Sequence, residues 1–125
     1  LVLLPFAEQL IATRRTQWEH YHSLLSSISE IHLLKIPAET EHNGSYFPLL
    51  NLTPAKSEKI IAALAEEGVE ARRYFHPSLN TVPYMKGAAC PISEAVAASV
   101  FCLPLYHDLT ESDREFISEI VRKNL

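Results

Sequence analysis

The chain has 125 residues, which fits one domain of ordinary size. Hydrophobic residues make up 47% and charged residues 21%, so the composition predicts a chain that folds rather than one that stays disordered. The net charge of −4 argues against a protein that binds a nucleic-acid backbone, because such proteins usually present a basic face.

The sequence also carries indications of compartment and origin. Two cysteines, Cys90 and Cys102, are too few for a disulfide framework, so we expect a protein of the reducing cytoplasm. No apolar run reaches the roughly 18 residues of a spanning helix, so no membrane partner is expected. The apolar residues 1–4 lack the basic flank and cleavage site of a signal peptide. Because the chain starts on Leu1 rather than Met, we expect a fragment of a longer protein.

The first predicted element is a helix over residues 5–25. Its apolar side chains recur at helical spacing, and Pro5 suits the first helical position because its missing N–H would have no partner there. We place Phe6 on its apolar face, and Arg14 on the face toward water or another domain. Residues 26–45 are polar and irregular, which indicates a loop.

A strand is predicted next, over residues 46–52. Its alternation puts Phe47 on one side and Tyr46 on the other. Pro48 cannot donate a hydrogen bond to a neighbouring strand, so we expect an edge position or a local break at this point.

Thr53 and Pro54 then predict the start of a second helix, as an N-cap followed by proline at the first helical position. Gly68 is the expected stop of this helix. Residues 69–75 are interpreted as a second strand with at least one charged side, and residues 76–87 as a loop that contains two prolines.

The last part of the chain predicts helix, strand and helix. Ser93 is expected to cap a short helix that ends near residue 99, with Val96 facing inward. Residues 100–103 form a brief apolar strand. Thr110 caps the last helix, and Asp113 stands where a capping box places its acid. We expect Phe116 in the buried stripe of this helix.

Together these elements predict an α+β domain, a two-layer sandwich of a long helix followed by strand-helix-strand-helix-strand-helix. Helices that alternate with short strands favour a small sheet covered by helices on one face. The other face of the sheet is expected to be partly free.

Residues that suggest metal or nucleophile chemistry have simpler explanations. The six histidines include His20 and His22, which lie two apart on the predicted helix and so point in different directions. We expect no metal site, because no cysteine or carboxylate stands at a familiar ligand spacing around them. Cys102 lies in an apolar strand and is interpreted as a small buried hydrophobe.

The segment 70–80 offers the strongest candidates for binding. Arg72, Tyr74, His76 and Asn80 fall on the end of a predicted strand and the loop after it. An arginine grips carboxylate or phosphate through a fork of donors, while tyrosine, histidine and asparagine can hydrogen-bond sugar hydroxyls. The alternative is a solvated edge strand with a proline-rich turn and no ligand.

Several segments in order resemble the DegT/DnrJ/StrS-type sugar aminotransferases. The run Cys-Pro-Ile-Ser-Glu-Ala-Val-Ala-Ala-Ser-Val-Phe-Cys-Leu-Pro-Leu-Tyr-His-Asp-Leu-Thr-Glu-Ser-Asp, residues 90–113, is similar to the family's C-terminal end. Residues 68–80, Gly-Val-Glu-Ala-Arg-Arg-Tyr-Phe-His-Pro-Ser-Leu-Asn, resemble a family segment that reaches the mouth of the active site. The pair Arg14-Arg15 and the strand at 43–50 also resemble family segments.

The resemblance implies that residues 1–125 are the C-terminal small domain of a longer enzyme. Such enzymes use pyridoxal phosphate to move an amino group, usually from glutamate, onto a keto sugar attached to a nucleotide. Residues 72–80 resemble members that act at carbon 4 of a deoxyhexose on a thymidine nucleotide. The family forms homodimers, and its large domain supplies the lysine that holds the cofactor.

No lysine here stands in the context of that cofactor lysine. We therefore carry over no catalytic or cofactor-binding residue, and we expect the chain alone to bind no cofactor. Only Arg72, Tyr74, His76 and Asn80 are carried over, as residues that face the substrate; at Asn80 the family often has histidine. The alternative function is a stand-alone α+β module that binds a ligand or a protein through the free face of its sheet.

Overall fold

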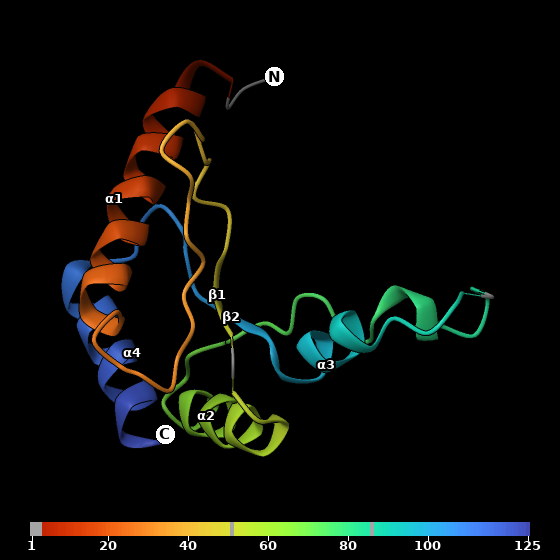
Figure 1. The fold of residues 1–125 in the computed structure, drawn as a ribbon. Coiled ribbons are helices and arrows are strands. Elements are labelled where there is room, and N and C mark those ends of the chain that lie inside the picture. The colour runs from red at the N-terminus through yellow and green to blue at the C-terminus, as the bar shows by residue number, and fades with distance from the viewer. Residues whose placement is uncertain (1–3, 51, 86) are drawn as a thin grey trace.

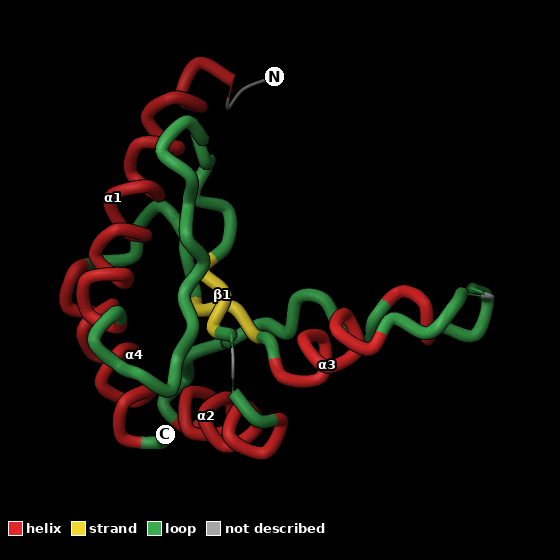
Figure 2. Tube along the Cα trace, in the orientation of Figure 1, coloured by secondary structure: helices red, strands yellow, loops and turns green. Residues whose placement is uncertain are grey.

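The computed structural model describes residues 4–50, 52–85 and 87–125. Within them, helices accompany a small two-stranded antiparallel sheet, which confirms the α+β class. Figure 2 shows the two short strands between the helices. The elements are η1 (Leu4–Phe6), α1 (Ala7–Leu25), β1 (Phe47–Leu49), α2 (Pro54–Glu66), η2 (Leu79–Thr81), α3 (Pro91–Ser99), β2 (Phe101–Leu103) and α4 (Glu111–Lys123).

The molecule has two parts of different shape. Helices α1 and α4 lie side by side, and α2 lies near the C-terminal end of α4, with the sheet beside them (Figure 1). We call this part the body; it comprises residues 4–50, 52–73 and 100–125. Residues 74–85 and 87–99, which carry η2 and α3, project from the body, and we call them the arm (Figure 1). The arm meets the body where α3 contacts α2.

The core of the body follows the alternation expected for the first strand. Phe47 and Leu49 are buried, whereas Tyr46 is half exposed. The buried side chains pack against Tyr21 and Leu25 of α1 within one continuous hydrophobic cluster. The Phe47 ring lies 5.1 Å from the Tyr21 ring, centroid to centroid. The sheet therefore presents one face to the helices, as predicted.

The sheet is narrower than the predicted three strands. β1 and β2 pair antiparallel, with Pro48 opposite Cys102. On the other side of β2, Cys102 exchanges both backbone hydrogen bonds with Arg72, and this isolated bridge is all that forms of the strand predicted at 69–75. A second isolated bridge joins His32 to Leu50. Extension of that bridge toward Pro48 would need a backbone N–H that proline lacks, which agrees with the expected local break.

The capping residues and the glycine singled out in the sequence predicted most helix ends correctly. The Thr53 hydroxyl accepts a hydrogen bond from the Lys56 backbone N–H at 3.3 Å, and the capping box of Thr110 and Asp113 is complete. Gly68 ends the turn after α2 with φ of 75°, a left-handed conformation that favours glycine.

The predicted cap of the arm helix was wrong. α3 begins at Pro91, with Cys90 at the N-cap position, so Ser93 lies inside the first turn. A proline at the first helical position suits the start of a helix, since its missing N–H needs no partner there. The Ser93 hydroxyl instead lies 2.7 Å from the Ser78 hydroxyl across the arm.

Three residues expected on buried faces are exposed. Phe6, Val96 and Phe116 are each more than two-fifths accessible. Val96 lies on the arm helix, and the first turn of α1 extends beyond the elements that α1 packs against (Figure 1). Phe116 borders an open cleft. Among the helices of the described residues, none combines the length and the apolar character needed to cross a bilayer.

Candidate functional site

An open cleft of about 790 Å³ lies along the edge of the sheet. Its walls come from the segment after α2, the end of β2 and the residues that follow it, the start of α4, and Arg14 of α1. Of the four predicted binding residues, Arg72 and Tyr74 line this cleft, whereas His76 borders a smaller hollow on the arm. The predicted set is thus divided between the cleft, which Arg72 and the first arm residue Tyr74 line, and the rest of the arm.

Arg72 is held at both its backbone and its side chain. The bridge to Cys102 fixes its main chain, and its Nη1 donates to the Tyr74 hydroxyl at 2.9 Å. Its Nε lies 3.3 Å from a carboxylate oxygen of Glu70. The Tyr74 hydrogen bond, and then the attraction of Tyr74 and Glu70, raise the pKa of Arg72 above its ordinary value. The guanidinium is exposed and charged, and it keeps further N–H groups for an anion.

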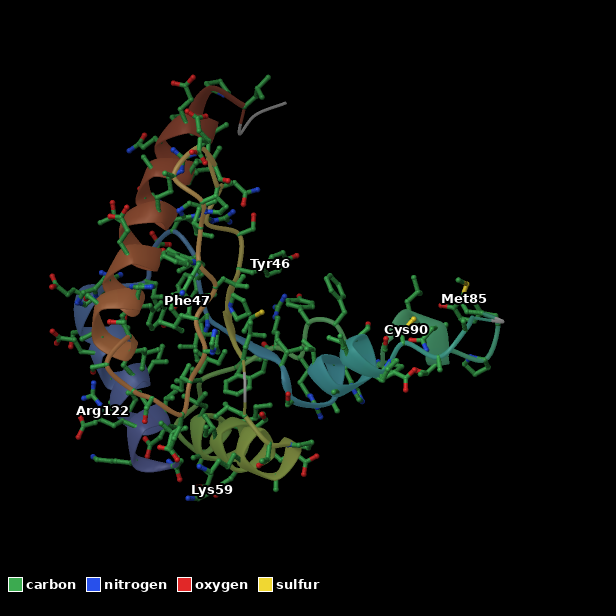
Figure 3. The ribbon with its side chains drawn as sticks, in the orientation of Figure 1. Tyr46, Phe47, Lys59, Met85, Cys90 and Arg122 are labelled. Carbon is green, nitrogen blue, oxygen red and sulfur yellow. The ribbon has the colours of Figure 1, made fainter. Side chains whose placement is uncertain are left out.

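Aromatic rings line the place where the arm leaves the body. The rings of Tyr46 and Tyr74 meet edge to face with centroids 5.3 Å apart, and Phe75 lies at the same distance from Tyr74. Figure 3 shows Tyr46 at this end of the body. Ring faces of this kind pack against a sugar or a base, while the hydroxyls supply hydrogen bonds.

Arg14 is a cleft residue that the sequence did not single out as a binding residue. Gly44 explains its position: a Cβ on Gly44 would lie 2.8 Å from the Arg14 Cβ, and Gly44 has φ of 62°. The loop before β1 therefore packs tightly on α1 and brings Ser45 and Tyr46 to the cleft together with Arg14. Among the described residues, the buried Arg14 Nε has no hydrogen-bond partner.

His76 and Asn80 lie on the arm, where both make contacts within the chain. The His76 Nδ1 is 2.9 Å from the Ala97 carbonyl oxygen, which requires the proton on Nδ1 and leaves Nε2 as an acceptor in the neutral ring. The Asn80 side chain bonds to Ser78, Ala88 and Glu94.

The described residues do not fit the cofactor that the family resemblance implies. Pyridoxal phosphate needs a lysine that can form a Schiff base in the site. No lysine of the described part lines the cleft. Lys56 pairs with Glu30 at 2.6 Å, and Lys123 pairs with Glu119 at the same distance. Lys35 and Lys59 are exposed on the surface of the body, and Lys86 lies outside the described residues.

A group of His20, Glu111 and Glu115 has the spacing of a metal site but not the required protonation. Arg114 donates from its Nε to the His20 Nδ1 at 3.0 Å, so the ring proton is on Nε2, which faces Glu111 at 3.6 Å. A neutral histidine binds a metal through a nitrogen that carries no proton. The arrangement is thus explained as a link between α1 and α4.

Cys102 behaves as predicted. It is buried in β2, and burial raises the pKa of its thiol to about 11. Such a thiol is a poor nucleophile, because the thiolate is the reactive form.

The model of the DegT/DnrJ/EryC1/StrS aminotransferase family matches residues 1–122. The chain belongs to this family. The curated relatives include the dTDP-4-amino-4,6-dideoxy-D-glucose transaminases of Escherichia coli and Shigella dysenteriae. The first is 30% identical over 119 residues, which are 89% of this chain and 32% of the relative. The second is 28% identical over an aligned length of 129 residues, which covers 98% of this chain and 35% of the relative.

Solved structures of aminotransferases share the fold. TlmJ from Streptoalloteichus hindustanus superposes with a TM-score of 0.90 at 24% identity, over 98% of this chain and 34% of that one. DesI, solved in the presence of its TDP-sugar product, superposes with a TM-score of 0.84 at 21% identity, over 96% and 32%. The chain thus spans about a third of the length of these relatives, and the match does not favour a stand-alone binding module.

Proposed function

We propose that the chain is the C-terminal small domain of a pyridoxal-phosphate-dependent aminotransferase that acts on a keto-deoxysugar nucleotide. The observation that carries the proposal is the family match over residues 1–122, together with coverage of only a third of the relatives. Both curated relatives named above are transaminases of a dTDP-linked aminodideoxysugar. In the reaction, glutamate becomes 2-oxoglutarate and the ketone carbon of the sugar becomes a carbon that bears an amino group.

The cofactor belongs to the part of the longer enzyme beyond these residues. When bound there, pyridoxal phosphate supplies the electron sink for transamination. In support, the lysines of the described part either pair with glutamate or are exposed away from the cleft lining. We expect the enzyme to be a cytoplasmic homodimer, with the exposed apolar side chains of the arm covered in the assembly.

Arg72 and Tyr74 are the residues we expect to contact the substrate from the cleft. Glu70 and Tyr74 restrain the Arg72 guanidinium, and its remaining donors suit the diphosphate of a nucleotide sugar. The edge-to-face rings of Tyr46 and Tyr74 offer a surface for a sugar or a base.

His76 and Asn80 are proposed to meet the sugar as acceptors. The His76 Nδ1 proton is engaged with the Ala97 carbonyl, so Nε2 is the nitrogen available to a sugar hydroxyl. Asn80 keeps one acceptor position on Oδ1, because Ser78 occupies the other.

The proposed reaction can be tested with the longer enzyme that carries this chain. With glutamate and a panel of nucleotide-linked keto sugars, we expect an amino-sugar product for a dTDP-linked 4-keto-6-deoxyhexose, detected by mass spectrometry. Arg72→Ala should raise KM by about tenfold or more, since a charge-assisted contact is lost. Arg122→Ala is the matched control, because Arg122 bonds the Leu24 carbonyl away from the cleft.

Two results would contradict the proposal. One is a longer enzyme that binds pyridoxal phosphate but aminates none of the keto-sugar nucleotides. The other is a borohydride-trapped cofactor adduct on the isolated chain, which we expect to show neither cofactor absorbance nor transamination. An equal effect of Arg72→Ala and Arg122→Ala would remove Arg72 from the substrate site while leaving the reaction itself intact.

A further inference from the structure

The arm is held by a compact set of polar contacts that joins its two halves. A carboxylate oxygen of Glu94 accepts hydrogen bonds from the Asn80 side-chain amide at 2.6 Å and from the Cys90 backbone N–H at 2.8 Å. The buried Ser78 hydroxyl donates to the Asn80 Oδ1 at 2.7 Å. Because that donation uses the single hydroxyl proton of Ser78, Ser93 is the donor in the 2.7 Å contact between the two hydroxyls. We call Ser78, Asn80, Ser93 and Glu94 the clasp.

Apolar packing contributes little within the described part of the arm. Ala97 is its one buried hydrophobic residue among those the structure describes. Large apolar side chains point outward, with Tyr84 and Ile92 each 81% exposed. Within the described chain an apolar core does not order this segment, so its shape depends on specific hydrogen bonds.

The donor capacity of Asn80 is used completely within the chain. Its Nδ2 carries two hydrogens, and these go to Glu94 at 2.6 Å and to the Ala88 carbonyl at 3.2 Å. Gly87 lies close beside it, since a Cβ on Gly87 would be 2.9 Å from the Asn80 Cβ. Asn80 therefore sits in a fitted position from which it can accept one further hydrogen bond and donate none.

We propose that Glu94 is the positioning residue of the arm: it fixes Asn80 and the N-terminus of α3 together, and so sets the geometry of the turn that carries His76. The contacts that carry this role lie within the chain, so it goes beyond the proposed reaction and does not depend on it. Asn80 acts first as part of the clasp, and its single free acceptor position is the only polar function it can offer to a ligand.

The protonation state of Glu94 agrees with this geometry. The Cys90 backbone N–H, and then the Asn80 amide, lower the pKa of the Glu94 carboxyl. A carboxyl whose pKa is depressed in the folded state stabilises the fold above its unfolded pKa, and the contribution is lost as pH falls through the folded value. His76 is the other titratable group in the small hollow that Glu94 borders, and its Nδ1 bonds the Ala97 carbonyl.

Amide hydrogen exchange on the chain tests the role of Glu94. In Glu94→Ala, exchange of the Cys90 backbone amide should rise by about tenfold or more, since it loses its hydrogen bond to the carboxylate. Exchange of the Thr81 amide, which donates to the Ser78 carbonyl oxygen at 2.9 Å, should rise as the clasp loosens. Glu94→Gln should recover part of the protection, because its amide oxygen still accepts both hydrogen bonds. Amides of α2 should be unchanged in both variants. Glu119→Gln is the matched control, a carboxylate whose pKa is also lowered, but on α4 by Lys123.

Two spectroscopic readouts separate positioning from simple structural support. The side-chain amide resonances of Asn80 should titrate with Glu94 in the native chain and lose that titration in Glu94→Gln, while any effect of His76 persists in both. Asn80→Asp should loosen the arm at neutral pH, where two carboxylates face each other, and recover protection on acidification when they share a proton.

The role is overturned if Glu94→Ala leaves the exchange of Cys90 and Thr81 at native values. It is also overturned if the Asn80 side-chain amide exchanges as fast as that of Asn43, whose amide nitrogen makes no contact among the hydrogen bonds of the described residues. Activity of the longer enzyme does not enter either outcome, so failure here is distinct from failure of the proposed function.

Discussion

The body and the arm are stabilised by opposite kinds of interaction. In the body, apolar side chains from α1, α2, α4 and the sheet form one continuous cluster, with Phe47 and Tyr21 almost fully buried. In the arm, hydrogen bonds between polar side chains take that place while Tyr84 and Ile92 face outward. Figure 3 shows Phe47 inside the body and Met85 out on the arm.

The body and the arm therefore differ in how they respond to small movements of their side chains. Burial of apolar surface is strong and tolerant of small movements, whereas a hydrogen-bond set depends on each partner's geometry. The body can therefore act as a rigid base, and the arm as a segment whose shape a few contacts decide.

The largest expected effect comes from truncation in the body. Phe47→Ala should lower the free energy of unfolding by about 3–5 kcal/mol, because a buried aromatic ring is replaced by a cavity. Urea denaturation followed by circular dichroism measures the loss. Tyr46→Ala is the control, since its side chain is half exposed and should cost far less. Equal losses would show that Tyr46 and Phe47 do not differ in burial as described.

The next largest loss of unfolding free energy is expected where the arm joins the body. The fully buried Ser57 hydroxyl donates to the Ser99 carbonyl at 2.6 Å, linking α2 to the end of α3. Ser57→Ala should cost about 1–3 kcal/mol in urea denaturation, because a buried carbonyl loses its partner. Ser118→Ala should be near neutral, since the buried Ser118 hydroxyl has no partner among the described residues. Similar losses for both would contradict the importance of the joint.

A smaller effect is expected at the capping box of α4. Thr110→Ala should lower the free energy of unfolding by about 1 kcal/mol, because the Asp113 backbone N–H loses its acceptor. Thr110→Ser keeps the hydroxyl and should retain most of the stability. Thermal denaturation of both variants checks this expectation, and equal melting temperatures would count against it.

The same cap predicts a pH dependence. Hydrogen bonds from the Thr110 side chain, and then from its backbone N–H, lower the pKa of Asp113. The resulting stabilisation is present above the unfolded pKa of the carboxyl and is lost as pH falls through the folded value. In Asp113→Asn this part of the acid dependence should be missing. Urea midpoints across the acidic range measure it, and unchanged acid dependence would contradict the assignment.

The smallest expected effect concerns reactivity rather than stability: the rates at which the two thiols react are compared. Cys90 is exposed on the arm, whereas Cys102 is buried in β2 with its thiol pKa raised to about 11. A thiol reagent at mildly alkaline pH should react with one fast and one slow phase. Cys90→Ser should abolish the fast phase. Two fast phases would mean that β2 opens far more readily than its packing indicates.

Local signals predicted the helices well and the sheet poorly. Thr53 and Thr110 were found as caps because a cap acts on a backbone N–H within three residues of it. The strand at 69–75 was overpredicted: an extended segment becomes a strand only where a neighbour pairs with it, and only Arg72 meets Cys102. Ser93 was mistaken for a cap because its partner, Ser78, lies across the arm.

The candidate site shows the same limit. Composition marked the segment 70–80 as the candidate for binding, and that assignment stays a prediction. The structure divides the set: Arg72 and Tyr74 line the cleft, whereas His76 and Asn80 lie farther along the arm. Arg14 was missed as a cleft residue, although Gly44, whose close approach fixes it there, stands out in the sequence.

The sequence by itself determined the family, the α+β class, most helix ends and the buried face of β1, because these depend on residue order and on interactions a few residues apart. Only the tertiary structure decided that Cys102 pairs with Arg72 and that Glu94 satisfies Asn80. Those partners are 30 and 14 residues apart. No local pattern specifies such pairs, since the packing of whole elements brings them together.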